Sequence, residues 1–364
     1  MTEPKDVPAL TGLRALAVGL VFLHHHGPSH PALQDPDVLS LVRQGHAGVA
    51  VFFVLSGFLI AHRYHDVAGS DVLRYLARRA WRILPLYWLL TALTFAWPLL
   101  QGEATTGLTW TQLFAHATLT RGWFQEWWST GIAQAWSLTP EAAFYLLAPL
   151  LFRLMRRVPY ALVTIPSVLL VVGVLLVEAC AGAAPAGFMA SYPFLMGATF
   201  LGRSFEFMVG VALAKAMRDR SPGTTLRFPT ALGGIAVAGI LFCGARLGVD
   251  YDDVLGVLLL NICLPLAIGL LLFGLLTERT LLQSVLGAGV MVELGNASYA
   301  FFLLHMGAPF NALLAFSSSF LMAACAILAA SWLLYRFVEE PCTRYGRRVF
   351  ALRHVKSATA RGST

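Results

Sequence analysis

The sequence has few charged residues. Only 12% of its 364 residues are Asp, Glu, Lys or Arg, about half the share of roughly 25% in a typical soluble domain. Hydrophobic residues make up 57% of the chain, and the mean hydropathy is +0.69. A chain of this length would otherwise suggest two or three soluble domains, but so little charge cannot cover their surfaces. The composition excludes a soluble globular protein and predicts a polytopic membrane protein.

Other features are missing as well. The five cysteines have neither CxxC nor metal-ligand spacing, which argues against a zinc site and a disulfide framework. No internal repeat is evident, which disfavours the transporters that are built from inverted repeats. The loops are short, so we expect one membrane domain over residues 1–345, followed by a basic, disordered cytoplasmic tail at 346–364.

Long apolar segments dominate what is present. Nearly all are long enough to cross roughly 30 Å of hydrocarbon as helices. We therefore predict an all-α integral membrane protein with ten transmembrane helices, of which 200–217 is the weakest, and an interfacial or re-entrant piece within 104–133. The predicted spans are 8–27, 46–64, 80–101, 134–154, 159–182, 200–217, 228–247, 252–276, 294–315 and 318–338.

The distribution of Lys and Arg predicts the orientation. With a cytoplasmic N-terminus, 22 of the 26 basic residues fall in inner segments and four in outer segments. Such an excess is typical of cytoplasmic loops. We expect both termini in the cytoplasm and a multi-pass protein of the cell membrane, with the lipid bilayer as a partner. The net charge of +7 follows from this topology and needs no nucleic acid to explain it.

Three consecutive histidines end the first apolar segment, in "FLHHHG" (22–27). Arg14 and His25 are eleven residues apart, about 1100° around a helix, and so share a face to within roughly 20°. His24 and His26 should face elsewhere. Three imidazoles that point in three directions cannot bind one metal ion, so we predict no metal site. The remaining alternatives are interfacial histidines at a helix end and one functional histidine, His25.

A buried carboxylate is predicted in "AWSLTPEAAFYLLAPL" (135–150). Pro140 suits the first turn of a helix, which places Glu141 where the helix dipole favours a negative charge. Glu141 is thus either a capping charge or, at a membrane depth similar to that of His25, half of an acid–base pair.

A basic run, "RYLARRAWRILPLYW" (74–88), enters the third predicted span from the cytoplasm. Arg78 and Arg82 should share a helix face, with Arg79 close by. Such a run either anchors the helix at the lipid phosphates or binds a phosphorylated cofactor, because guanidinium groups bind phosphate bidentately.

These segments, in this order, resemble the acyltransferase 3 family of integral membrane acyltransferases. The Arg-x10-His spacing of Arg14 and His25 resembles the opening helix of that family. The other similar segments are "GVAVFFVLSGFLIAHRY" (48–64), "RRAWRILPLYW" (78–88), "WSLTPEAAFY" (136–145), "LGNASYAFFLLHMGAP" (294–309) and "FVEEPCTR" (337–344).

The chain departs from the family pattern at several points. Phe302 replaces the more usual tyrosine of the late helix, and "LTGLR" replaces the common "DGLR" before Arg14. The variant resembles the branch that acylates small natural products such as macrolides. We expect no esterase-like domain of the kind that is fused to many members acting on surface polysaccharides.

The resemblance implies a membrane O-acyltransferase that moves a short acyl group from acyl-CoA (acetyl-CoA or another short-chain thioester) to a hydroxyl. The acceptor would be a surface glycan or a glycosylated, macrolide-like small molecule. Arg78, Arg79 and Arg82 would hold the donor phosphates. His25 would act as general base, because a neutral imidazole can accept a proton at physiological pH. An acyl-enzyme intermediate and direct transfer both remain open.

Further residues receive supporting roles in this interpretation. Glu141 would orient the imidazolium, and Arg14 would bind the donor or fix its helix. Trp136 and Tyr145 would line the substrate cavity, whereas His305 belongs either to the site or to a polar network in the core. Glu339 should pair with Arg336 or Arg344. Acceptor specificity is expected in 28–45, 104–133 and 183–202, where Trp110, Trp123, Trp127 and Trp128 either stack on sugars or form an interfacial belt.

Two other function classes fit some of the same residues. A transporter of acyl donors or small metabolites would also place His, Glu and Arg inside the membrane. A non-catalytic scaffold would leave these buried polar groups unexplained.

Overall fold

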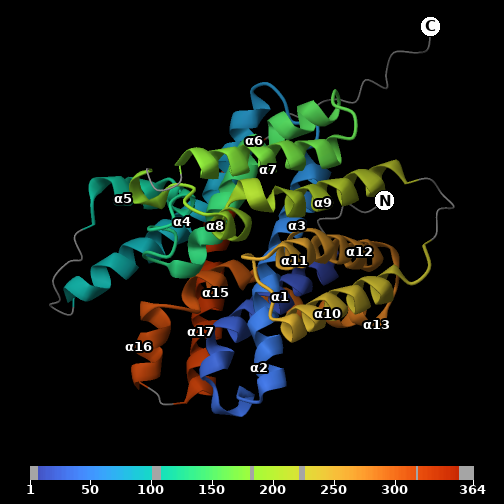
Figure 1. Ribbon diagram of the computed structural model, residues 1–364. Coiled ribbons are helices and arrows are strands. Elements are labelled where there is room, and N and C mark those ends of the chain that lie inside the picture. The colour runs from blue at the N-terminus through green and yellow to red at the C-terminus, as the bar shows by residue number, and fades with distance from the viewer. Residues whose placement is uncertain (1–6, 101–107, 181–183, 221–225, 317–318, 352–364) are drawn as a thin grey trace, which may run out of the picture.

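The computed structural model describes residues 7–100, 108–180, 184–220, 226–316 and 319–351 (Figure 1). Within these ranges the chain is helical, and the β-structure is one isolated bridge between Phe124 and Phe188. The all-α prediction is confirmed. The α-helices are α1 Pro8–His26, α2 Pro36–Arg43, α3 Gly48–Tyr64, α4 Asp71–Leu100, α5 Trp110–Ala117, α6 Leu138–Met155, α7 Ala161–Cys180, α8 Tyr192–Ala198, α9 Phe200–Asp219, α10 Pro229–Leu247, α11 Val254–Val257, α12 Leu264–Thr277, α13 Leu281–Leu286, α14 Gly289–Asn296, α15 Ser298–Leu304, α16 Ala308–Phe316, α17 Phe320–Leu334 and α18 Glu340–Val349.

Eight helical segments among the described residues are long and apolar enough to cross a membrane, and they coincide with eight of the ten predicted spans. The protein is therefore a multi-pass membrane protein. The predicted span 80–101 lies within α4, apart from residue 101, which is outside the described residues. The predicted span 294–315 is divided into α14, α15 and α16, with a turn after His305.

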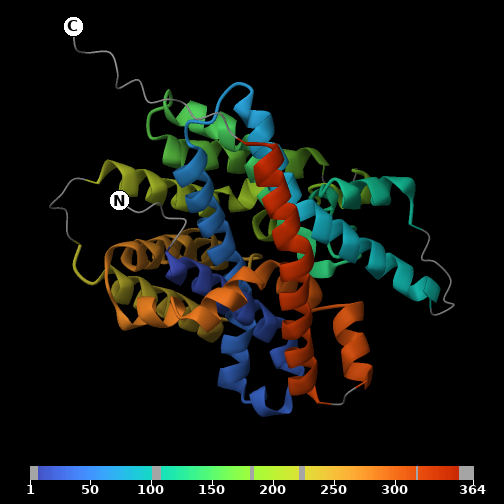
Figure 2. The ribbon, with the colours of Figure 1, turned by 180° about the vertical axis from the view of Figure 1, so that it is seen from behind.

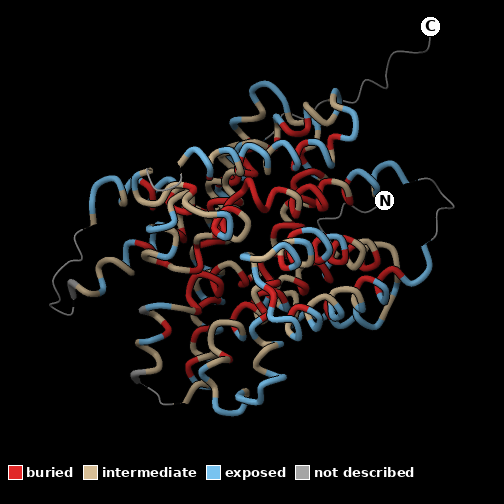
Figure 3. Tube along the Cα trace, in the orientation of Figure 1, coloured by how far each residue is buried: buried red, intermediate tan, exposed pale blue. Residues whose placement is uncertain are grey.

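Helices α3 and α9 form the centre of the bundle (Figure 3). In an apolar stretch of the segments that contain them, 72% and 83% of the residues are buried, against 17% in α10. Glycines allow the two backbones to touch: a Cβ added at Gly57 would lie 2.0 Å from the carbonyl oxygen of Phe207. Such close approach at small residues is typical of helix pairs in membranes. The segment 200–217, the weakest prediction, is thus at the core.

Helices α17 and α18 continue one another through a π-helical turn, Tyr335–Glu339, and α18 packs on α4 (Figure 2). The predicted pairing of Glu339 with two arginines is wrong, because Glu340 makes both ion pairs, at 2.7 Å to Arg336 and 2.8 Å to Arg344. Glu339 is instead buried, within electrostatic range of Arg14 and Arg82. The predicted tail overlaps the end of α18, and residues 352–364 lie outside the described part of the chain.

Candidate active site

Two adjacent cavities lie in the interior of the bundle. The first, here called the arginine chamber, has a volume of about 80 Å³, and the second, the histidine chamber, about 530 Å³. Val49 and Phe302 line both, so they form a common wall. The polar lining of the arginine chamber includes Arg14, Ser56, Arg79, Arg82, Glu141 and Tyr145. That of the histidine chamber includes His24, His25, His46, Trp136, Arg203 and Tyr251.

Glu141 is the hydrogen-bonding centre of the arginine chamber. It lies in the first turn of α6, as predicted. Ser56 on α3 donates a hydrogen bond to its Oε1 at 2.9 Å, and the hydroxyl of Tyr145, one turn further along α6, donates to the same oxygen. Glu141 is therefore a partner of α3 and of its own helix, and not only a capping charge.

The arginines of α4 divide between two surroundings. Arg79 and Arg82 line the arginine chamber, and Arg79 donates from Nη2 to the hydroxyl of Tyr64 at 2.9 Å. Arg78 lies outside the chamber, where its Nε donates to the carbonyl oxygen of Phe350 at 2.7 Å. Since each residue turns the helix by about 100°, Arg78 faces the end of α18 while its neighbour faces inward. Arg78 and Arg82 therefore do not share one site as expected.

His25 lines the histidine chamber, and His24 lines it too. The expectation that His24 faces away was wrong. The chamber is wide enough to contact two faces of α1, those of His24 and His25, and it also reaches His46. His24 and His46 each donate from Nδ1 to the carbonyl oxygen of Arg43, at 2.6 and 3.0 Å. His26 does face elsewhere: its Nε2 donates to the carbonyl oxygen of His305 at 2.6 Å.

His305 is fully buried beside His25, with 5.4 Å between the ring centroids. Its Nδ1 donates to the carbonyl oxygen of Phe302 at 2.8 Å, and its Nε2 has no hydrogen-bond partner among the described residues. In a neutral ring that bonds through Nδ1–H, Nε2 is an acceptor. His305 thus belongs both to the packed core and to the surroundings of His25.

The structure does not bring His25 and Glu141 together. Trp136 lines the histidine chamber with His25, but Glu141 and Tyr145 line the arginine chamber, beyond Val49 and Phe302. The two residues thus line different chambers. No hydrogen bond or ion pair joins His25 to Glu141 in the described structure, and each residue has other neighbours.

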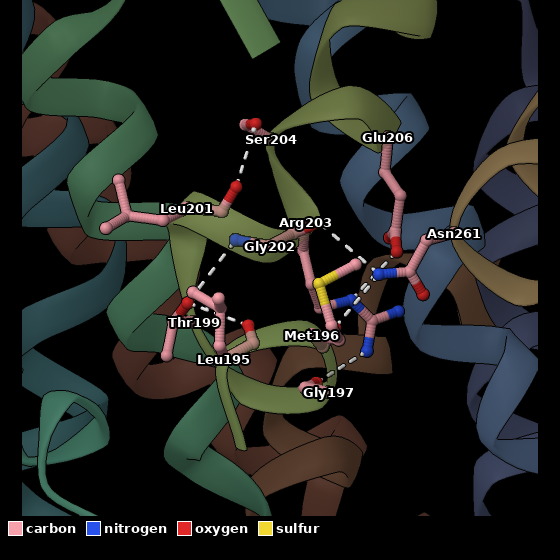
Figure 4. A network of polar contacts seen from close by, with 10 residues as sticks. All are labelled: Leu195, Met196, Gly197, Thr199, Leu201, Gly202, Arg203, Ser204, Glu206 and Asn261. Carbon is pink, nitrogen blue, oxygen red and sulfur yellow. Dashed lines mark hydrogen bonds and ion pairs between the residues drawn. The ribbon is translucent and has the colours of Figure 1, made fainter. Parts of the chain in front are cut away.

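Sequence reasoning missed an ion pair in the core. Arg203 and Glu206 are 2% and 0% exposed, and Arg203 Nε lies 2.8 Å from Glu206 Oε1 (Figure 4). The signal was present as a charged pair with i, i+3 spacing inside the apolar segment 200–217, where unpaired charges are expensive.

Sequence reasoning also missed the residue that folds the loop over the histidine chamber. Arg121 is 1% exposed and donates to the carbonyl oxygens of Trp128 (2.8 Å), Thr130 and Ile132. Burial lowers the pKa of this guanidinium. The adjacent His116 contacts the Thr130 hydroxyl at 3.0 Å, and burial, reinforced by the charge of Arg121, lowers its pKa to about 4. These residues hold Trp128 in the chamber wall.

No group of three or more His, Cys, Asp or Glu side chains with the geometry of a metal site occurs among the described residues. The polar chemistry of both chambers rests on imidazole, guanidinium, carboxylate and hydroxyl groups.

Comparisons with known proteins agree on an acyltransferase. The model of the acyltransferase 3 family, described as an acyltransferase domain, matches residues 7–336. Acyltransferase MdmB of Streptomyces mycarofaciens is 28% identical over 94% of this chain and 93% of its own length. O-acetyltransferase OatA of Staphylococcus aureus is 27% identical over 41% of this chain and 25% of its own length. No solved structure matches the chain.

Proposed function

Because the chain belongs to the acyltransferase 3 family, we propose that it moves a short acyl group from acyl-CoA to a hydroxyl of a sugar or glycosylated small molecule, with His25 as general base. The observation that carries this proposal is a pair of chambers that share lining residues. One chamber is lined by three arginines, and the other by three histidines and several aromatic rings. A two-substrate transfer needs a donor and an acceptor to meet at one place, and in this proposal they meet beside Val49 and Phe302, which line both chambers.

The arginine chamber suits the donor. Arg14, Arg79 and Arg82 line it, and guanidinium groups are the preferred partners of phosphate oxygens. The excess of basic residues in the predicted inner segments favours a cytoplasmic opening for it, which is where acyl-CoA would enter. In this proposal Arg78, which is bonded to carbonyl oxygens near the end of α18, is not among the residues that hold the donor.

The histidine chamber suits the acceptor. Trp128, Trp136 and Tyr251 supply aromatic surface, and Gln134 and two carboxylates of 250–252 add polar groups. Flat apolar faces combined with a few polar groups are typical of small-molecule sites. A macrolide-like natural product or a surface glycan would both present sugar hydroxyls to this lining.

The chemical step follows from this arrangement. His25 takes the proton of the acceptor hydroxyl while the oxygen attacks the thioester carbonyl at the common wall. The C–S bond then breaks, and the leaving thiolate takes a proton from the His25 imidazolium. The His305 ring lies 5.4 Å from that of His25, so His305 is a polar neighbour of the imidazolium that forms on His25. Glu141 acts in the donor chamber, where Ser56 and Tyr145 hold it.

The proposal is tested with the full chain, purified in detergent and supplied with a panel of acyl-CoAs and sugar-bearing acceptors. Thiol release over time and the mass of each acceptor are measured together. We expect thiol release that depends on the acceptor and an acceptor mass increased by one acyl group. Acyl transfer from CoA would be refuted if no thiol were released and no acceptor were modified with any member of the panel.

A further inference from the structure

Arg203 is a charged residue in the wall of the histidine chamber that the chemical step above does not use. It is 2% exposed, and Glu206, its ion-pair partner, is 0% exposed. A buried pair of this kind is weak evidence for stability, because desolvation of the two charges opposes their attraction. Its presence in the chamber wall therefore suggests a role beyond holding α9 in place.

A break in the helix positions Arg203. Helix α8 ends at Ala198 and α9 begins at Phe200, with Thr199 extended between them (φ −101°, ψ 156°). The break leaves the carbonyl oxygen of Gly197 exposed to side chains, and Arg203 Nη1 donates to it at 3.0 Å (Figure 4). Non-helical backbone at membrane depth is tolerated where it is buried in protein or lines a cavity.

A second irregular helix supports the first. The π-helical segment Leu258–Cys263 carries Asn261, whose Nδ2 donates to the carbonyl oxygens of Met196 (3.0 Å) and Gly202 (3.3 Å). Figure 4 shows Asn261 and Glu206 on the same side of the guanidinium group of Arg203. Single π-turns occur frequently at functional sites. Two interrupted helices thus fix one arginine side chain.

One nitrogen of this guanidinium group lacks a hydrogen bond of standard geometry. Nε donates to Glu206 and Nη1 to Gly197, whereas the buried Nη2 makes no such bond among the described residues, and the hydroxyl of Tyr251 is the further polar group that interacts with the guanidinium group. The guanidinium carbon lies 5.8 Å from the ring of Trp136 and 5.4 Å from that of Tyr251, two other residues of the chamber lining. Glu206 offsets the positive charge of Arg203. A ligand at Nη2 would therefore meet a directed N–H donor within a pair that has no net charge. It suits a neutral oxygen better than an anion.

We propose that Arg203 orients the acceptor: Nη2 donates a hydrogen bond to an acceptor oxygen next to the hydroxyl that His25 deprotonates. The preferred substrates are then diols and hydroxy ethers, as in sugars, and not isolated alcohols. This inference rests on the proposed acyl transfer, and it names the recognition group of the same site.

The test uses the acceptor identified in the transfer assay and an analogue that lacks the neighbouring oxygen. Removing a partner of a charged hydrogen-bond donor should lower kcat/KM of the wild type by about 10- to 100-fold. Arg203→Lys keeps a positive charge beside Glu206 but loses the planar fork, so it should treat both acceptors alike within about 3-fold. The double variant Arg203→Met/Glu206→Met removes both charges together and serves if the single variant does not fold.

Two further measurements separate recognition from a purely structural role. KM for acyl-CoA should stay unchanged in the Arg203 variants, while KM for the intact acceptor rises. Arg246→Met, which removes an arginine from an exposed ion pair with Asp37 (2.8 Å), should keep the wild-type preference for the intact acceptor.

The inference is overturned if the wild type accepts both compounds equally, if the variants keep the preference, or if they lose donor and acceptor binding together. In these cases thiol is still released by the wild type, so acyl transfer itself stands. Absence of any acyl transfer by the wild type would instead overturn the proposed function and this inference with it.

Discussion

The two chambers share a wall but differ in how their polar groups are assembled. In the arginine chamber, two cations come from one turn of α4, and the carboxylate of Glu141 is bonded by Ser56 and Tyr145. In the histidine chamber, the polar groups come from α1, the 3₁₀ turn Gln44–Ala47, α9 and the loop after α10. Both chambers are assembled by the tertiary fold, but two of the three arginines of the first lie only three residues apart on α4.

This difference indicates a division of labour. A donor with invariant phosphates needs fixed guanidinium groups, which the basic run of α4 provides together with Arg14 of α1. An acceptor needs a surface of matching shape and directed hydrogen bonds, which requires contributions from several elements. Changes in the two chambers should therefore alter different kinetic parameters.

The largest effect is expected from the general base. His25→Ala should lower kcat by about 10²- to 10⁴-fold, the usual contribution of such a group, because the variant lacks the imidazole proposed to take the acceptor proton. Thiol release in saturating donor and acceptor measures it. His26→Gln is the matched control, since His26 lies outside the chamber and bonds to a backbone carbonyl. Equal rates for both variants would contradict the role of His25.

The next effect compares neighbouring arginines of α4. Arg82→Met should raise KM for acyl-CoA by about 10- to 100-fold, as expected for one charge-assisted contact to phosphate. Arg78→Met should change KM for acyl-CoA less than about 3-fold, because Arg78 bonds to carbonyl oxygens near the end of α18. The measurement is steady-state kinetics with the acceptor saturating. A larger effect at Arg78 than at Arg82 would place the donor outside the arginine chamber.

Local patterns predicted much of the donor side. Apolar length located eight of the spans, and the basic run located the helix that carries Arg79 and Arg82. A period of 3.6 residues, however, describes an undistorted helix in isolation, so it does not say which neighbour each side faces. This is why Arg78 was grouped with Arg82 although it faces α18.

The acceptor side was less predictable, because its residues meet only in the folded chain. His46 and Tyr251 are more than 200 positions apart, and their ring centroids lie 5.8 Å from each other. The angular argument correctly separated His26 from His25, but it could not give the width of the chamber and so excluded His24. The similar membrane depth predicted for Glu141 and His25 likewise did not show that the two residues line different chambers.

A smaller effect should follow from altering the common wall. Phe302→Ala removes a ring that lines both chambers and makes room for a longer acyl chain. The ratio of kcat/KM for butanoyl-CoA to that for acetyl-CoA should rise by about 10-fold, in the range that added methylene groups give in apolar pockets. Phe242→Ala, on the exposed side of α10, controls for the loss of a ring. An unchanged ratio would mean that the acyl group does not pass this wall.

The smallest effect concerns the loop that covers the histidine chamber. The pKa of His116 is about 4 in the fold against an ordinary value of 6.5, so below pH 6.5 the unfolded chain binds a proton that the folded loop does not. Stability should therefore fall as the pH falls from 6.5 towards 4, by an amount on the order of 1 kcal/mol at pH 5. Thermal unfolding in detergent at pH 7.5 and pH 5 measures this loss, which His116→Gln should reduce. Because the loop lines only the histidine chamber, acid should raise KM for the acceptor before it alters KM for acyl-CoA, and the reverse order would assign the two substrates to the opposite chambers.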